Sequence, residues 1–199
     1  KEKNLIMKTE LKSINLPSSY NHRFGVMLYE QVLKHRPKVI YDIGVLSGFS
    51  TAYLAMAAKE IGARVVAVDF FELYEYSSVS QEEFESNMME LDLMDTIEVQ
   101  KMSVDSWLDL NIPSEFIHLD ISNTGETLLD FFNQVKGNPV VLFEGGWEKR
   151  DNQDWMLKYN KKKIIPTLKE NNINFELLCT EVIDDGDRIY HPSLSKAVL

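Results

Sequence analysis

The stretch Val39–Thr51 constrains the fold more than any other part of this chain. Its sequence, VIYDIGVLSGFST, begins as an apolar run and passes through an aspartate into a turn with Gly44 and Gly48. A helix-favouring segment, AYLAMAA, follows directly. A strand, a tight loop and a helix start in this order are typical of a nucleotide-like ligand site at the edge of a parallel sheet.

Strand-like and helix-like segments alternate along the rest of the chain. Apolar and β-branched runs predict strands at 38–43, 64–69, 96–102, 116–120, 139–144 and 175–183. Helical spacing predicts helices at 22–35, from the glycine turn to about 61, and at 81–91, 128–135 and 161–170, the last interrupted or bounded by Pro166. A turn at Asp184–Asp187 precedes a return strand, which begins at 188–190 or lies in 196–199. We expect a doubly wound α/β fold, with a mostly parallel seven-stranded sheet and an antiparallel closing hairpin.

Length and charge narrow the class of protein. The 199 residues predict one domain, with a helical cap at 1–36 and an α/β core at 37–199. A net charge of -10 argues against nucleic acid or an anionic membrane as partner. The single cysteine, Cys179, is predicted to be a buried strand thiol, and no apolar run approaches the ~20 residues of a membrane span. We expect a cytoplasmic protein, and self-association into a homo-oligomer stays open.

The spacing of the glycines excludes two familiar ligand classes. A dinucleotide loop needs G-x-G-x-x-G, and Phe49 stands where its third glycine would fall. A Walker loop needs a lysine, and this loop has none. The loop is therefore shaped for close approach of a ligand without an obvious phosphate cradle.

The pattern acid-x-Gly-x-x-x-Gly-x-Ser, from Asp42 to Ser50, resembles the first motif of the class I S-adenosylmethionine-dependent methyltransferases. The likeness is greatest to the small O-methyltransferases of the catechol O-methyltransferase type and their bacterial relatives. Upstream, the segment RFGVML at 23–28 is similar to the helix that precedes the motif in that group. The resemblance covers roughly residues 22–190, and Leu46 stands where many members carry a third glycine.

The resemblance implies S-adenosylmethionine as the cofactor. It implies contacts from Asp42, Gly44, Gly48 and Ser50 of the motif. Asp69, at the end of the second predicted strand, can accept hydrogen bonds from the two ribose hydroxyls. In the family the position of Ser103 touches the adenine edge. Asp105 competes for that role, and Ser103 could instead cap a helix.

Two carboxylates are candidates for the chemistry. Asp120 ends the fourth predicted strand and Glu144 the fifth, and in metal-dependent members of the family the equivalent residues bind Mg²⁺. Such a cation would bind the substrate oxygen, lower its pKa and align it with the methyl group. Gly145 departs from the Asp or Asn that relatives usually place there. Asp120 could instead lie beside the cofactor or act as general base without metal, so the use of Mg²⁺ stays open.

The acceptor is expected to be a hydroxyl of a small molecule, such as a sugar or a natural-product intermediate. The sequence after the fourth strand, DISN, lacks the Asn/Asp-Pro-Pro-Tyr/Phe clamp of methyltransferases that act on bases or glutamine. His22 is a further catalytic candidate on the acceptor side. Residues 145–156 predict a loop or lid with Trp147 and Trp155 as walls, in which Arg150 could pair an acidic substrate group. The alternative function is a catalytically inactive methyltransferase-like binding module within a larger assembly.

Overall fold

The computed structural model describes residues 14–74, 79–184, 186 and 189–199. The chain divides into two compact units, 1–107 and 108–199, and each is described by itself. Residues 1–13 of the predicted helical cap, and Asp185 and Asp187 of the predicted turn, lie outside the described residues. The assignment of a single domain stays a prediction. No helix among the described residues is long and apolar enough to cross a membrane.

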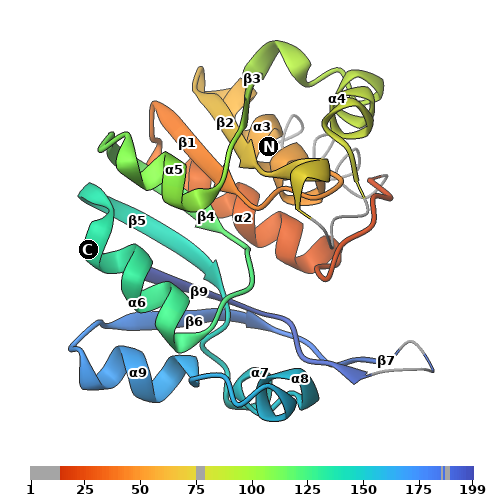
Figure 1. Ribbon diagram of the computed structural model, residues 1–199. Helices are drawn as coiled ribbons and strands as arrows, with labels where there is room; N and C mark the ends of the chain where they lie inside the picture. The colour runs from red at the N-terminus through yellow and green to blue at the C-terminus, as the bar shows by residue number, and fades with distance from the viewer. Residues whose placement is uncertain (1–13, 75–78, 185, 187–188) are drawn as a thin grey trace. The chain divides into compact units, whose positions relative to one another are not determined.

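The strands confirm the predicted fold class. Their hydrogen-bonded order is β3 (Ile97–Lys101), β2 (Arg64–Asp69), β1 (Val39–Ile43), β4 (Pro113–Leu119), β5 (Lys136–Glu144), β9 (Ser193–Val198) and β6 (Phe175–Thr180) (Figure 1). Pairing is parallel between β1 and β2, β2 and β3, and β4 and β5, whereas β9 runs antiparallel to β5 and β6. The fold is thus the predicted α/β arrangement with a mostly parallel seven-stranded sheet and flanking helices.

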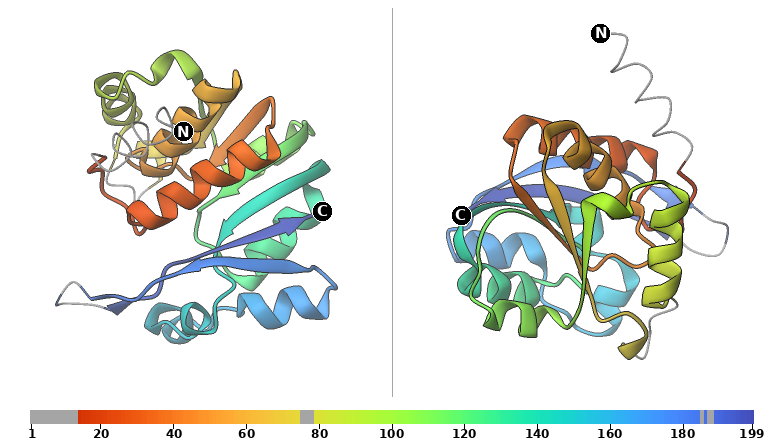
Figure 2. Two further views of the ribbon diagram at one scale, coloured as in Figure 1. Left: turned by 180° about the vertical axis from the view of Figure 1, so that it is seen from behind. Right: turned by 90° about the horizontal axis from the view of Figure 1, so that it is seen from above.

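The closing strands differ in detail from the prediction. The run at 175–183 is divided, because β6 ends at Thr180 and a separate two-stranded antiparallel sheet follows. That small sheet pairs β7 (Ile183–Asp184) with β8 (Ile189–Tyr190). The strand that returns to the main sheet is β9, at 193–198, and it lies between β5 and β6 (Figure 2). The apolar and β-branched runs indicated the strands but could not assign their partners.

The first unit is built around two almost fully buried strands. The interiors of β1 and β2 are apolar apart from Asp42, and the helix before β1 contacts the helix after it. Its helical segments are α2 (His22–His35), α3 (Phe49–Ile61), η1 (Phe71–Leu73), α4 (Gln81–Glu90), η2 (Met94–Thr96) and α5 (Val104–Asp109). Helix α3 is alanine-rich and nearly all buried, and it is bounded by Gly48 and Gly62 in left-handed conformations. This burial fixes the direction in which α3 leaves the glycine turn.

The second unit packs aromatic side chains against β5. Phe132, Phe143 and Phe175 form successive edge-to-face contacts, with ring centroids 5.8 Å apart in each pair. Its helices are α6 (Gly125–Gln134), α7 (Glu148–Asp151), α8 (Asp154–Lys158) and α9 (Ile164–Glu170). Cys179 is buried in β6, as predicted, and cannot be an exposed reactive thiol.

Helix α9 begins later than predicted, and Pro166 lies inside its first turn. A proline is tolerated there because the first N–H groups of a helix have no intrahelical partner. The carboxylate of Asp151 accepts hydrogen bonds from the N–H groups of Ile164 and Ile165, each at 2.9 Å. Asp151 is buried, so it takes the place of water at the start of α9 and ties α7 to α9.

The substitution Asp151→Ala should lower the free energy of unfolding by about 1–2 kcal/mol, because two buried helix N–H groups lose their acceptor. Urea unfolding followed by circular dichroism measures the change. The matched control is Asp154→Ala, an exposed aspartate at the start of α8, which should change the free energy by less than about 0.5 kcal/mol. Equal losses in the two variants would contradict the capping role.

Candidate functional site

The turn between β1 and α3 runs through three residues in left-handed backbone conformations: Gly44 at φ 85°, Leu46 at φ 47° and Gly48 at φ 96°. The N–H of Gly44 donates to the carbonyl of Val68 at 2.9 Å, which attaches the turn to β2. The positive φ of Gly48 favours glycine, and a Cβ there would also require the terminal methyl of Met88, 2.5 Å away, to move. The turn therefore leads into α3 with no side chain at two of its positions, Gly44 and Gly48.

Asp42, near the end of β1, stabilises this turn through its carboxylate. Its carboxylate is fully buried and accepts hydrogen bonds from Oγ of Ser50 at 3.0 Å and Oγ1 of Thr51 at 2.6 Å. The three side chains join the end of β1 to the first turn of α3. Thr51 was not identified from the sequence, although a hydroxyl next to Ser50 could have suggested it. Direct contact of Asp42 or Ser50 with a cofactor stays a prediction, because their polar atoms are engaged with each other.

Asp69 binds the same turn from the end of β2. Its Oδ2 accepts hydrogen bonds from the N–H groups of Val45 at 2.8 Å and Leu46 at 3.1 Å, and its Oδ1 accepts one from Phe71 at 2.7 Å. Asp69 is partly exposed, and a carboxylate offers about four lone-pair sites. The carboxylate can therefore organise the turn and still accept a hydrogen bond from a ligand hydroxyl.

Leu46 explains why glycine is common at this position in the family that the motif resembles. Its φ of 47° is left-handed, which costs a residue with a Cβ roughly 1–2 kcal/mol. Its side chain is 41% exposed, a high value for a leucine beside a glycine turn. The chain thus keeps an apolar side chain at the tip of the turn in a strained conformation, next to the carboxylate of Asp69.

Ser103 caps a helix in this structure. Its Oγ accepts a hydrogen bond from the N–H of Ser106 at 3.1 Å and donates to Oγ of Ser106 at 3.0 Å. This is the capping alternative, observed at the start of α5. Contact of Ser103 with adenine, and the competing role of Asp105, stay predictions.

His22 lies at the first position of α2 and contacts α3. Its Nδ1 is 2.9 Å from the hydroxyl oxygen of Tyr53, which is fully buried. Burial raises the pKa of Tyr53 to about 12, so the phenol is protonated at neutral pH and can donate this hydrogen bond. The catalytic role of His22 stays a prediction.

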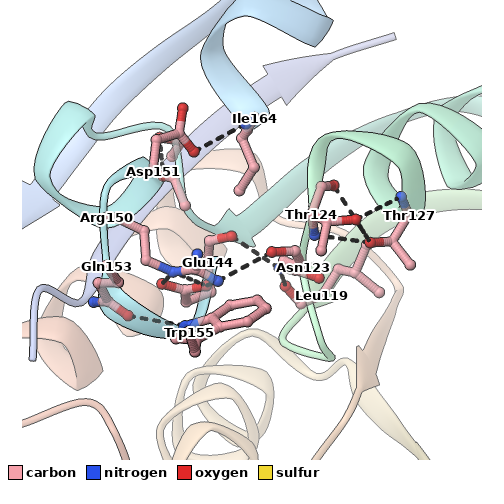
Figure 3. A network of polar contacts seen from close by, with 12 residues as sticks. Leu119, Asn123, Thr124, Thr127, Glu144, Arg150, Asp151, Gln153, Trp155 and Ile164 are labelled. Carbon is pink, nitrogen blue, oxygen red and sulfur yellow. Dashed lines mark hydrogen bonds and ion pairs between the residues drawn. The ribbon is translucent and has the colours of Figure 1, made fainter. Parts of the chain in front are cut away.

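In the second unit, Glu144 and Arg150 form a buried ion pair (Figure 3). Nε of Arg150 lies 2.7 Å from Oε1 and 2.9 Å from Oε2 of Glu144, and Nη2 lies 2.7 Å from Oε2. The exposed fractions of the two side chains are 5% and 8%. Removing one partner of such a pair typically costs about 3–5 kcal/mol, because the other charge is left buried without compensation.

The surroundings shift the ionisation of both partners. Burial raises the pKa of Glu144, and the Arg150 guanidinium opposes that effect. Burial alone would lower the pKa of Arg150, but the charges of Glu144, Asp120 and Asp151 raise it overall. We take the pair as ionised, because three hydrogen bonds from a guanidinium stabilise a carboxylate. Pairing of Arg150 with an acidic group of a substrate stays a prediction: Glu144 takes its Nε and Nη2 donors, and its Nη1 has no hydrogen-bond partner among the described residues.

Asn123 connects the ion pair to two strands. Its Nδ2 donates to the carbonyls of Leu119 at 3.0 Å and Glu144 at 2.9 Å, and its own carbonyl accepts from Nη2 of Arg150 at 3.0 Å (Figure 3). The guanidinium carbon of Arg150 lies 4.9 Å from the ring centroid of Trp155. The ring of Trp155 therefore packs against the guanidinium of the ion pair, and its role as a wall of an acceptor pocket stays a prediction. No sequence pattern pointed to Asn123, which lies in a loop.

The residues predicted to hold Mg²⁺ do not fit a metal site. Both carboxylate oxygens of Glu144 accept hydrogen bonds from Arg150. Gly145 has φ 125°, a conformation that strains any residue with a Cβ, and a Cβ there would also require the Cδ1 end of the Ile164 side chain, 2.4 Å away, to move. Across residues 14–74, 79–184, 186 and 189–199, no group of three or more His, Cys, Asp or Glu side chains could hold a metal ion. Asp120 is partly exposed after β4, and its charge contributes to the raised pKa of Arg150.

Comparisons with known proteins give a structural likeness only. No family model matches the chain, and no curated protein matches it. An O-methyltransferase from Bacillus cereus in complex with SAH is 19% identical with a TM-score of 0.64, and the match covers 100% of this chain and 89% of that one. Cofactor-bound Rv0187 from MTB is 16% identical with a TM-score of 0.64, covering 100% and 90%. The O-methyltransferase TomG from Streptomyces achromogenes, involved in tomaymycin synthesis and solved with SAM, is 12% identical with a TM-score of 0.58, covering 90% and 81%. The chain therefore has the fold of the class I S-adenosylmethionine-dependent methyltransferases.

Proposed function

We propose that this chain binds S-adenosylmethionine and transfers its methyl group to a hydroxyl of a small molecule. The observation that carries the proposal is the turn of β1 and α3 held by Asp69, with left-handed glycines at 44 and 48. The likeness of fold to methyltransferases solved with SAM or SAH supports it.

The turn offers the groups that an adenosine cofactor needs. Helix α3 has no side-chain cap, so the first N–H groups of a 13-residue helix remain available to a ligand. Asp69 would accept hydrogen bonds from the vicinal ribose hydroxyls while it keeps its bonds to the turn. Leu46, exposed at the tip of the turn, would add apolar contact with the nucleoside.

Bound S-adenosylmethionine supplies an electrophilic methyl group on a sulfonium. The hydroxyl acceptor must lose its proton, and we assign that proton to the carboxylate of Asp120, which is partly exposed. Attack on a sulfonium neutralises charge, so a site that aligns the oxygen and excludes water favours it. The segment DISN after β4, which lacks the Asn/Asp-Pro-Pro-Tyr/Phe clamp, supports an oxygen acceptor over an aromatic or amide nitrogen.

Thermal unfolding tests cofactor binding. S-adenosylmethionine at about 100 times its Kd should raise the Tm of the wild-type protein by about 5–10 °C. Asp69→Ala should abolish most of this shift, and Asp69→Asn, which keeps one acceptor oxygen, should retain part of it. Each variant is compared with its own ligand-free Tm, because Asp69 also stabilises the turn.

The control for this experiment is Asp130→Ala, an exposed aspartate on α6 that should leave the shift unchanged. Absence of any shift in the wild-type protein at millimolar S-adenosylmethionine would contradict the cofactor assignment. An Asp69→Ala variant that keeps the full shift would contradict the role of this carboxylate.

A screen of hydroxylated acceptors with methyl-labelled S-adenosylmethionine tests the transfer. For any acceptor that is labelled, Asp120→Asn should lower kcat by at least about 100-fold while the Tm shift with S-adenosylmethionine persists. Asp130→Asn serves as the matched control. Cofactor binding without labelling of any acceptor would instead favour the inactive binding module.

A further inference from the structure

The positively charged guanidinium of Arg150 is held in a fixed position near the end of β5. Arg150 is 4% exposed, and its Nε and Nη2 are held by Glu144 and by the carbonyl of Asn123 (Figure 3). Asn123 in turn donates to the last residue of β5 and to the last residue of β4. The guanidinium is therefore positioned by buried hydrogen bonds from several directions and cannot swing away at low cost.

This arrangement removes the ligands that a divalent ion would use. The oxygens of Glu144 accept from Arg150, and both oxygens of Asp151 accept from backbone N–H groups of α9. Asp120 lies close enough to Arg150 for their charges to interact. A divalent cation at Asp120 would face the positive charge of Arg150, and the described residues offer it no group of three or more His, Cys, Asp or Glu side chains.

We propose that the Arg150 guanidinium takes the place that a divalent cation would occupy beside Asp120 and Glu144, and that methyl transfer by this chain needs no metal ion. The statement that methyl transfer needs no metal ion rests on the proposed function. The replacement of the cation by Arg150 rests on its ion pair with Glu144 alone. Arg150 supplies a permanent positive charge near Asp120, which a bound Mg²⁺ supplies in metal-dependent enzymes.

Mn²⁺ binding, measured by electron paramagnetic resonance on the full chain, tests the replacement without any substrate. The EDTA-dialysed wild-type protein should bind Mn²⁺ only with a Kd above about 1 mM. Glu144→Gln should leave that value unchanged, as should the control Glu148→Gln, an exposed glutamate four residues further on. Micromolar Mn²⁺ binding that Glu144→Gln weakens by about tenfold or more would overturn the proposal.

Removing the guanidinium provides the converse measurement. Arg150→Met should tighten Mn²⁺ binding by at least about tenfold, because the carboxylates of Glu144 and Asp120 then no longer face the guanidinium, and adding Glu144→Gln to that variant should reverse the gain. A folded Arg150→Met variant with no gain would overturn the replacement. If Arg150→Met does not fold, the Mn²⁺ titrations of the wild-type protein and of Glu144→Gln decide by themselves whether the proposal holds.

Activity separates this proposal from the proposed function. For an acceptor that is labelled, transfer by EDTA-dialysed protein should equal transfer with added Mg²⁺. Loss of transfer on dialysis, restored by Mg²⁺, would overturn metal independence and leave methyl transfer intact. Failure of S-adenosylmethionine to bind would contradict the proposed function while the Mn²⁺ titrations still judge the ion pair.

Discussion

Three backbone N–H groups converge on the carboxylate of Asp69, and the proposed cofactor site depends on them. Val45 and Leu46 donate to one oxygen and Phe71 to the other, so a single side chain joins the glycine turn to the end of β2. Without that acceptor, buried or partly buried N–H groups of a left-handed turn would need water. The carboxylate thus builds the turn first, and ligand recognition uses the lone pairs that remain.

Asp42 makes a second connection of the same kind. It is fully buried and binds two hydroxyls at the start of α3, so its role in this structure is to fix the angle between β1 and the helix. An acidic residue in the first motif can therefore be required for the shape of the turn rather than for contact with a ligand. The hydrogen bonds of the Asp42 and Asp69 carboxylates hold the turn in place and so maintain the strained backbone conformation of Leu46.

Sequence reasoning succeeded where periodicity and turn chemistry act locally. The helix at 22–35 was predicted with its observed bounds, and the glycines at 44 and 48 have the left-handed conformations that a tight turn requires. It failed where a pairing depends on how the chain folds back. Glu144 and Arg150 are close in the chain, but their pairing depends on how α7 turns back after two glycines, and no pattern in the sequence encodes that return. The position of β9 between β5 and β6 is a choice among sheet edges between segments far apart in the chain.

In the second unit, a guanidinium is placed against the carboxylate of Glu144. The backbone at Gly145 has a positive φ that strains any residue with a Cβ. A buried ion pair contributes little net stability compared with an apolar pair of the same size, so we attribute to Glu144 and Arg150 the placement of charge rather than a gain in folding energy.

A crystal structure of the chain with S-adenosylhomocysteine tests the central claim most directly. The account predicts that both ribose hydroxyls lie within hydrogen-bonding distance of the Asp69 carboxylate, with the nucleoside over the turn that contains Gly44 and Gly48. A nucleoside bound elsewhere, or a ribose directed away from Asp69, would contradict it.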